Sequence, residues 1–284
     1  MVGRPQRAGV MRRTAPPGFP SQRADAQPWG RRALAGLVGA GAGLLSGLFG
    51  VGGGIVLVPA LVVVLGLDQR RAAATSLVAI MPAALVGALS YGLRGEVSLI
   101  AAALLVLGSL LGTQIGVRLL HRLPTRALSW VFVAFIIVVL IGQRLSAPGR
   151  GGELALDPTR CAGLAVVGLV AGVMAGLVGV GGGVVVVPGM EIVLGAGDLL
   201  ARGTSLAAMV PTALSGTVSN LRRGSADLRI GLLAGLASAA TSPAGAALAA
   251  GLSPAVGRWL FSAFLLLAAL SVIHRAQRAG EGRG

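Results

Sequence analysis

Charged residues, cysteine, histidine and aromatic side chains are scarce in this chain of 284 residues, and each scarcity excludes a class of protein. Only 12% of the residues are charged, about half the share that is usual in a soluble domain. The single cysteine, Cys161, excludes an intramolecular disulfide. The two histidines, His121 and His274, lie far apart in the sequence, so no cluster of histidine and cysteine has the spacing of a metal site. We therefore expect no metal and no cofactor.

Hydrophobic residues make up 55% of the chain, and several apolar runs reach the roughly 18–20 residues that cross a bilayer. The fold class that this composition predicts is an all-α polytopic membrane protein. The formal net charge of +15 comes from arginines in short loops and at the termini, a placement typical of the cytoplasmic side of a membrane protein. Aromatic residues make up only 4% of the chain, too few for base-stacking platforms, so we expect no nucleic acid partner.

The sequence contains two copies of one pattern, and matched residues such as Pro59 and Pro188 lie 129 positions apart. The segment GLFGVGGGIVLVPALVVVLG, residues 47–66, returns as GLVGVGGGVVVVPGMEIVLG, residues 176–195. Such a repeat sets the architecture, so we predict two homologous membrane halves. The expected domains are a disordered basic cytoplasmic tail over 1–32, the first half over 33–143, a polar linker over 144–160, the second half over 161–273 and a short basic tail over 274–284.

The first apolar block of each half, residues 33–67 and 161–197, is too long for one span. A straight helix over either block would measure more than about 50 Å, against a hydrocarbon core of about 30 Å. Each block is predicted to break at its glycines, as a re-entrant hairpin or as two short helices, with three full spans after it. The helix after each break begins at Pro59 and Pro188, or one turn earlier, directly after the glycines. The following spans contain one predicted kink each, at Pro82 and Pro211.

Arginine placement predicts which loops face the cytoplasm. The loops near 70–71, 118–126 and 222–229 carry arginines, whereas those near 94–96 and 246–255 carry no net charge. The bias flips between equivalent loops of the two halves, which is typical of an inverted repeat. We predict that both termini are cytoplasmic. A parallel repeat with four plain spans in each half is the alternative.

The matched glycine triplets are the candidate substrate site. Irregular backbone at membrane depth is tolerated only beside protein or a water-filled cavity, and broken segments in corresponding positions point to a transporter's binding site. Each new helix would direct free N–H groups and about half a positive charge at the break, which suits a small anion. The alternative role is close helix packing, which we expect instead for Gly36, Gly39, Gly43, Gly168 and Gly172. The predicted substrate-binding glycines are Gly52, Gly53, Gly54, Gly181, Gly182 and Gly183.

Hydroxyl residues begin the second apolar block of each half, and we predict that they donate hydrogen bonds to the anion at the edge of the cavity. Local helix capping is the alternative. Tyr91 and Asn220 are weaker candidates, while Arg94 and Arg223 are expected to anchor helix ends at the interface, with a gating role as the alternative. The predicted hydroxyl donors are Thr75, Ser76, Thr204 and Ser205.

Glu191 is the one carboxylate inside an apolar block, and its repeat partner is Val62. Counted from Pro188 as the first helical position, Glu191 falls in the first turn of the short helix, where negative charge is favourable. Either Glu191 is a fixed countercharge at that helix end, or it takes up a proton when the anion binds and couples transport to protons.

The repeated pattern G-x-G-G-G-x-x-x-x-P, followed by T-S-L and a proline, resembles the TauE/SafE family of sulfite exporters. It runs from Gly50 to Pro59 and from Gly179 to Pro188, and the likeness covers residues 33–273. The resemblance implies an inner-membrane permease of sulfur-containing anions such as sulfite, thiosulfate or organosulfonates.

We predict a multi-pass secondary transporter in the inner (plasma) membrane that exports sulfite or an organosulfonate. An uptake permease or a passive anion channel is the alternative. The chain is not expected to be an enzyme, because its spans contain no Ser/His, Cys/His or paired-carboxylate set. Its expected partners are the small anion, a coupling proton and the lipid bilayer.

Overall fold

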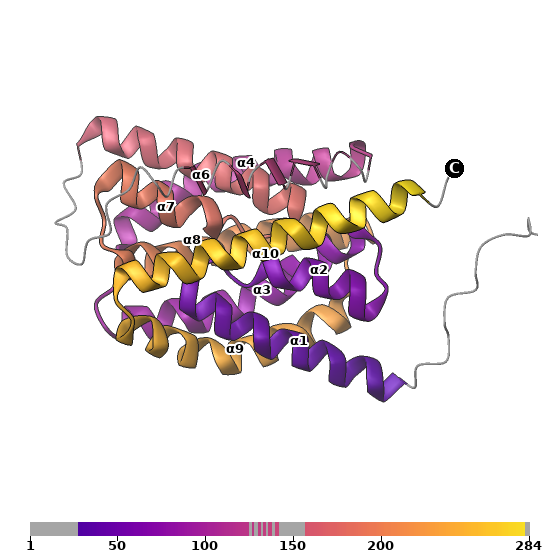
Figure 1. Ribbon diagram of the computed structural model, residues 1–284. Helices are drawn as coiled ribbons and strands as arrows, with labels where there is room; N and C mark the ends of the chain where they lie inside the picture. Colours follow the sequence, from indigo (N-terminus) through magenta and orange to yellow (C-terminus); the bar gives the residue numbers. More distant parts are fainter. Residues whose placement is uncertain are drawn as a thin grey trace, which may run out of the picture.

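The structure, a computed structural model, describes residues 28–124 and 157–281 and scattered residues between 127 and 141. All regular structure in these residues is α-helical, as predicted, and the helices form one bundle (Figure 1). The linker over 144–160, the last span of the first half and the tail over 1–32 fall largely outside the described residues. The helices are α1 (Pro28–Phe49), α2 (Gly54–Leu65), α3 (Gln69–Gly92), α4 (Leu99–Arg122), α6 (Pro158–Val178), α7 (Gly183–Leu194), α8 (Asp198–Arg222), α9 (Leu228–Gly251) and α10 (Pro254–Glu281).

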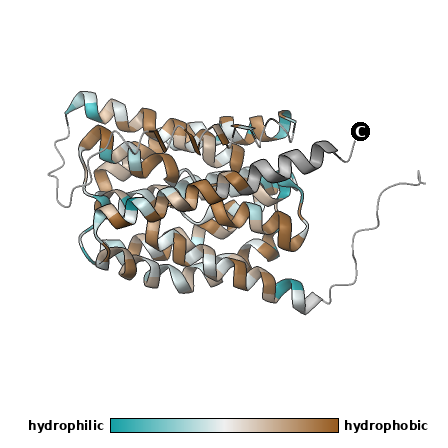
Figure 2. Cartoon of the chain, in the orientation of Figure 1, coloured by the Kyte–Doolittle hydropathy of each residue, from teal (hydrophilic) through white to brown (hydrophobic). Residues whose placement is uncertain are grey.

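Five of the described helices, α1, α3, α4, α6 and α9, are long and apolar enough to cross a membrane. Hydrophilic residues gather toward the two ends of the bundle, and hydrophobic residues lie between them (Figure 2). Large apolar side chains face outward, among them Leu37 with 71% and Leu107 with 64% of its surface exposed. The chain is therefore a polytopic membrane protein. α8 was expected to be a full span, but it begins with Asp198 and Arg202 and is not among the five.

Both long apolar blocks break at their glycines. The glycine loops, defined here as residues 50–53 and 179–182, connect α1 to α2 and α6 to α7. In each loop three glycines have a positive φ, between 70° and 83°, a conformation that residues with a Cβ rarely adopt. α2 and α7 have 12 residues each and measure about 18 Å, too short to cross the hydrocarbon core.

The two short helices begin directly after the glycines, at Gly54 and Gly183. The alternative in which Pro59 and Pro188 are the first helical residues is wrong, because both prolines lie inside their helices. The valines before each proline are helical rather than extended. A glycine in the left-handed conformation turns the chain sharply enough to start the helix at once, so the proline is not needed as the first residue.

Small residues let the first helix of each half pack closely along the fourth helix of the other half. α1 lies along α9, and α6 lies along α4. A Cβ built on Gly39 or Gly43 would collide with the backbone of α9, and one built on Gly168 or Gly172 would collide with the backbone of α4, so these four are packing glycines as predicted. The same expectation is wrong for Gly36, which has open space around its Cβ position.

Hydrogen bonds hold together the end of the bundle where α1 begins, called here the α1 end. Arg31 Nη2 donates to Leu65 O at 2.9 Å, which closes the hairpin of α1 and α2. Arg70 Nη2 donates to Leu123 O at 2.8 Å, which joins the start of α3 to the end of α4. α10 ends toward this same end (Figure 1). The hairpin of α6 and α7 opens at the opposite end, called here the α6 end (Figure 1).

Candidate functional site

The two glycine loops meet in the middle of the bundle. A Cβ built on Gly54 would lie 2.6 Å from Gly179 O, and one built on Gly183 would lie 2.6 Å from Gly50 O. Each short helix therefore begins against the backbone of the opposite loop. Only glycine fits at Gly54 and Gly183 without moving the other half.

Ser76 and Ser205 each bond to the loop of the other half. Ser76 Oγ donates to Gly179 O at 2.6 Å, and Ser205 Oγ donates to Gly50 O at 2.8 Å. The two bonds are related by the repeat, because donors and acceptors are both 129 positions apart. The hydroxyl protons are thus committed to backbone acceptors, and an anion could receive them only after the loops separate.

Thr75 and Thr204 accept hydrogen bonds from backbone N–H groups, whereas the adjacent serines donate hydrogen bonds. Thr75 Oγ1 accepts from Asp227 N at 3.0 Å, and Thr204 Oγ1 accepts from Ser98 N at 3.0 Å. Ser98 and Asp227 are the N-cap residues of α4 and α9. The structure therefore brings the two serines to the glycine loops and directs the two threonines to the starts of neighbouring helices. Binding of substrate by these four hydroxyls remains a prediction.

Two apolar side chains cover the glycine loops from the central helices. Ile80 of α3 and Met209 of α8 are repeat partners, and they are 0% and 2% exposed. A Cβ built on either Gly52 or Gly181 would collide with Met209 Cε and would lie 3.1 Å from an Ile80 methyl carbon. The centre is therefore closed to ions in this conformation.

The N-termini of α2 and α7 are buried at this centre without side-chain caps. Their N-cap residues, Gly53 and Gly182, make no side-chain hydrogen bond. The first N–H groups of a helix have no acceptor within it, and each helix start carries about half a positive charge. This arrangement can stabilise one small anion once the covering side chains move.

A proline follows each of the two side chains that cover the glycine loops. Pro82 and Pro211 follow Ile80 and Met209 by two residues within α3 and α8. Each proline lacks an N–H donor, which removes the helical hydrogen bond to the carbonyl four residues earlier. That loss weakens both central helices next to the residues that cover the centre.

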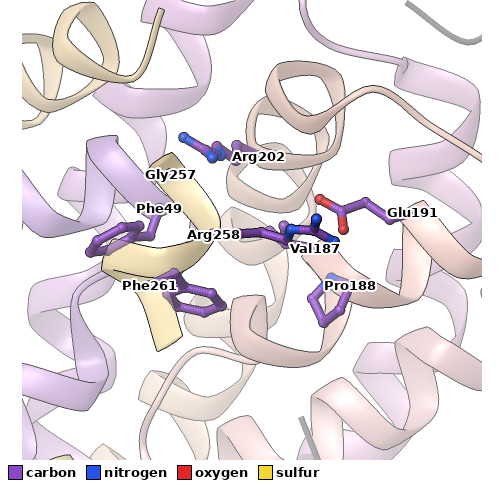
Figure 3. A pocket seen from close by; sticks show the side chains of 8 residues that line it. All are labelled: Phe49, Val187, Pro188, Glu191, Arg202, Gly257, Arg258 and Phe261. Atoms are coloured by element: carbon purple, nitrogen blue, oxygen red, sulfur yellow. The ribbon is translucent and has the colours of Figure 1, made fainter. Parts of the chain in front are cut away.

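A second candidate site is a small charged pocket of about 20 Å³, room for about one water molecule. Figure 3 shows Glu191 of α7 and Arg258 of α10 facing each other across it. Arg202 of α8 lies at its edge, and Phe49 and Phe261 line its apolar side.

Arg202 is held firmly at the edge of the pocket. It is 5% exposed, its Nη1 donates to Leu48 O at 2.7 Å, and its Nη2 lies 3.4 Å from Asp198 Oδ2. These two partners fix the guanidinium group and partly balance its charge.

The expected position of Glu191 in the first turn of its helix is wrong. α7 begins at Gly183, so Glu191 lies in the last turn, close to Leu194. The helix dipole disfavours a carboxylate there, so the stabilising charges come from Arg202 and Arg258 instead.

Sequence reasoning did not find Arg202, Asp198 or Arg258. A signal was present, because all three break the repeat: their partners in the first half are Ala73, Gln69 and Ser129. Charged residues that replace neutral ones in only one copy of a repeat mark a feature that the two halves do not share. The three substitutions converge on one region of the structure with Glu191, whose partner Val62 is also neutral.

Of the remaining candidates, Tyr91 and Arg94 join helices, whereas Asn220 bonds within its own helix and Arg223 is exposed. Tyr91 Oη donates to Gly47 O at 2.8 Å, and Asn220 Nδ2 donates to Gly216 O at 2.9 Å. Arg94 Nη1 donates to Ala246 O at 2.9 Å, which joins the end of α3 to α9. Arg223 is exposed at the C-cap of α8.

Comparison with known proteins identifies related membrane proteins. The family profile of the sulfite exporter TauE/SafE matches residues 4–142 and 164–284. A probable membrane transporter protein of Xylella fastidiosa (strain 9a5c) is 28% identical over 202 residues, which are 69% of this chain and 75% of that protein. The probable membrane transporter protein YunE of Bacillus subtilis (strain 168) is 33% identical over 107 residues, and the match spans only 38% of each chain.

Proposed function

The chain belongs to the sulfite exporter TauE/SafE family of membrane transporters, and on this premise we propose that it is a secondary transporter that exports sulfite or an organosulfonate across the inner membrane. The observation that carries the proposal is the meeting of two buried, uncapped helix N-termini, those of α2 and α7, between the two halves. Helix starts favour oxyanions, and glycine lets an anion approach the backbone closely.

The proposed architecture is an inverted repeat. It is supported by the two serine bonds, which are exchanged between the halves at repeat-related positions, and by the hairpins of α1–α2 and α6–α7, which open at opposite ends of the bundle (Figure 1). Transporters of this design move one half against the other around a central site. Such a movement would break both serine bonds and release their protons toward the anion.

The proposed orientation places the α1 end, and with it both termini, in the cytoplasm. The charge distribution supports this orientation, because arginine is favoured on the cytoplasmic side. Among the side chains that the structure describes, the α6 end has four arginines (Arg94, Arg160, Arg202 and Arg258) and four carboxylates (Glu96, Asp157, Glu191 and Asp198). Counted in the same way, the α1 end has two carboxylates, Asp68 and Asp227, and nine arginines: Arg31, Arg32, Arg70, Arg71, Arg118, Arg122, Arg222, Arg223 and Arg229.

Glu191 is the proposed proton acceptor. It is a carboxylate within the apolar region that two arginines stabilise, and an intramembrane ionisable residue is a functional candidate by default. If it takes up a proton as the anion binds, an imposed pH step drives the flux. Uptake, or passive flow through a channel, is the alternative mode of transport.

Flux into liposomes tests the proposal. Purified protein in liposomes is compared with empty liposomes for sulfite, thiosulfate, methanesulfonate, sulfate and chloride, with and without a pH step. We expect protein-dependent flux of sulfite or methanesulfonate that the pH step accelerates. Flux that follows only the electrochemical gradient of the anion would identify a channel, and no flux of any sulfur-containing anion would overturn the proposal.

A further inference from the structure

We propose that the charged pocket between α7, α8 and α10 is a second oxyanion-binding site, in which a sulfonate group binds Arg258 and Arg202 in place of the Glu191 carboxylate. The pocket adjoins the first glycine loop, because a Cβ built on Gly50 would lie 2.6 Å from Arg202 Cα. Its charged groups gather farther along, where α7 ends and α8 and α10 begin. The inference rests on the proposed function only for the chemical class of the anion.

The pocket has the chemistry of an oxyanion site. A guanidinium group presents five N–H donors in a planar fork that matches a carboxylate, sulfonate or phosphate. Arg258 and Glu191 face each other across the cavity (Figure 3), so this structure already contains one oxyanion opposite Arg258. Phe49 and Phe261 line the apolar side, and apolar surroundings strengthen the attraction between opposite charges.

Arg202 is preorganised as the second cation. Its bonds to Leu48 O and Asp198 hold the guanidinium group before any ligand arrives, so binding orders little of it. A Cβ built on Gly257 would lie 2.7 Å from Arg202 Nη2. Gly257 therefore keeps the space beside this nitrogen free of a side chain, although its repeat partner is Leu128.

The charges of the cluster determine how a ligand can enter. The charged groups that act on Glu191 of α7 are Asp198 and Arg202 of α8 and Arg258 of α10. The two carboxylates balance the charge of the two guanidinium groups. From α3, Tyr91 interacts with Arg202. A further anion would leave an uncompensated negative charge in a buried site, which is unfavourable. The anion therefore binds when Glu191 swings away or when its carboxylate takes a proton from solution. The sulfonate and the Glu191 carboxylate thus compete for the same guanidinium groups.

The charged residues that line the pocket occur in only one copy of the repeat. Glu191, Arg202 and Arg258 correspond to the neutral Val62, Ala73 and Ser129 of the first half, so the repeat supplies no second set of these charges. An anion would therefore meet Arg258 on one side of the membrane and none of these groups on the other. This asymmetry suits a site that receives or releases the anion at the α6 end.

Calorimetric binding of methanesulfonate to the full chain in phosphatidylcholine nanodiscs tests the inference. This probe keeps a constant charge between about pH 6 and pH 8, so any pH dependence in that range comes from the protein. We expect binding to the wild type to strengthen as the pH falls. Glu191→Gln removes the competing charge, so the affinity at neutral pH should rise about tenfold and lose most of its pH dependence. Arg258→Gln should weaken binding about tenfold or more, which is the effect of one charge-assisted hydrogen bond.

Arg258→Lys retains the charge and should recover part of the affinity, and the exposed Arg223→Gln at the α1 end is the matched control, expected to bind as the wild type does. Size-exclusion profiles confirm that each variant is folded. Nanodiscs that contain phosphatidylglycerol test a lipid phosphate as the natural source of the oxyanion, which would lower the apparent affinity of the wild type but not of Arg258→Gln.

Unchanged or weaker binding in Glu191→Gln, wild-type binding in Arg258→Gln, or no binding to either the wild type or Glu191→Gln would overturn the pocket site. The liposome flux of the wild type is independent of these results. A protein that transports sulfite but fails these binding tests retains the proposed function and loses the second site.

Discussion

Ser76 and Gly179, 103 residues apart in the sequence, are joined by a hydrogen bond of 2.6 Å from the serine hydroxyl to the glycine carbonyl. The repeat supplies the same bond from Ser205 to Gly50. Each half thus supplies a serine donor, and the glycine loop of the other half supplies the carbonyl that accepts the bond. The transport movement proposed above would break both bonds.

Removal of the serine donors should loosen the closed centre. Ser76→Ala and Ser205→Ala are each expected to lower the free energy of unfolding by about 0.6–1 kcal/mol, the usual worth of a hydrogen bond between membrane helices. Thermal unfolding in detergent measures the effect. Ser90→Ala is the control, because its hydroxyl bonds only within its own helix, to Val86 O at 2.8 Å. An equal loss in all three variants would contradict a special role for the exchanged bonds.

Met209 should limit the size of the anions that pass. Met209→Ala leaves a gap beside both glycine loops, so flux of larger organosulfonates should rise relative to sulfite, while the free energy of unfolding falls by about 2–5 kcal/mol. Met209→Ile copies its partner Ile80 and stiffens the side chain, so transport should slow. Liposome flux with sulfonates of increasing chain length measures both effects. An unaltered size preference in both variants would show that Met209 does not cover the route.

Two glycines should tolerate no side chain, while a third tolerates one freely. In Gly54→Ala and Gly183→Ala the new Cβ would lie 2.6 Å from a backbone oxygen of the other loop, so the loops must separate, at about 1–3 kcal/mol or more. Gly36→Ala meets open space and should stabilise its helix by up to about 1 kcal/mol. Thermal unfolding of the three variants gives the order, and a Gly36→Ala variant as unstable as the other two would contradict it.

The orientation can be checked by labelling in intact cells. In a Cys161→Ala background, a cysteine at position 146 should react with an impermeant maleimide added outside, because the linker is predicted to be outside. A cysteine at Ser225, between α8 and α9 at the α1 end, should be protected until the cells are opened. The reverse pattern would show that the orientation is opposite to the proposed one. Equal labelling of both positions in intact cells would contradict their placement on opposite sides of the membrane.

Sequence periodicity was enough to predict the repeat, the helical class and the two glycine breaks, because each depends on local composition and span length. The start of α7 was harder to predict, since a proline is favourable as the first helical residue and also tolerable one turn later. Because α7 begins at Gly183 rather than at Pro188, Glu191 lies in the last turn of the helix instead of the first. The pairing of Ser76 with Gly179 could not be predicted, because it depends on how the two halves cross.

Spacing alone did not predict which glycines pack against a neighbouring helix. Gly39 and Gly43 lie on the face of α1 that meets α9, whereas Gly36 has the same residue type and similar spacing but faces open space. Which face of a membrane helix meets a neighbour depends on the partner helix rather than on the residue itself. Arg202 was missed for a related reason, since its salt-bridge partner Asp198 is local but two of the other groups around it, Leu48 O and Glu191, lie on other helices.

The exchange of donors between the halves has a consequence for synthesis. When α1 to α4 have left the ribosome, the carbonyl of Gly50 has no partner until Ser205 is made, and α1 lacks α9 to pack along. The N-terminal half therefore waits in the membrane as an incomplete piece and reaches its final shape only after most of the chain is translated. Assembly is in this sense an association between two fragments that share one polypeptide.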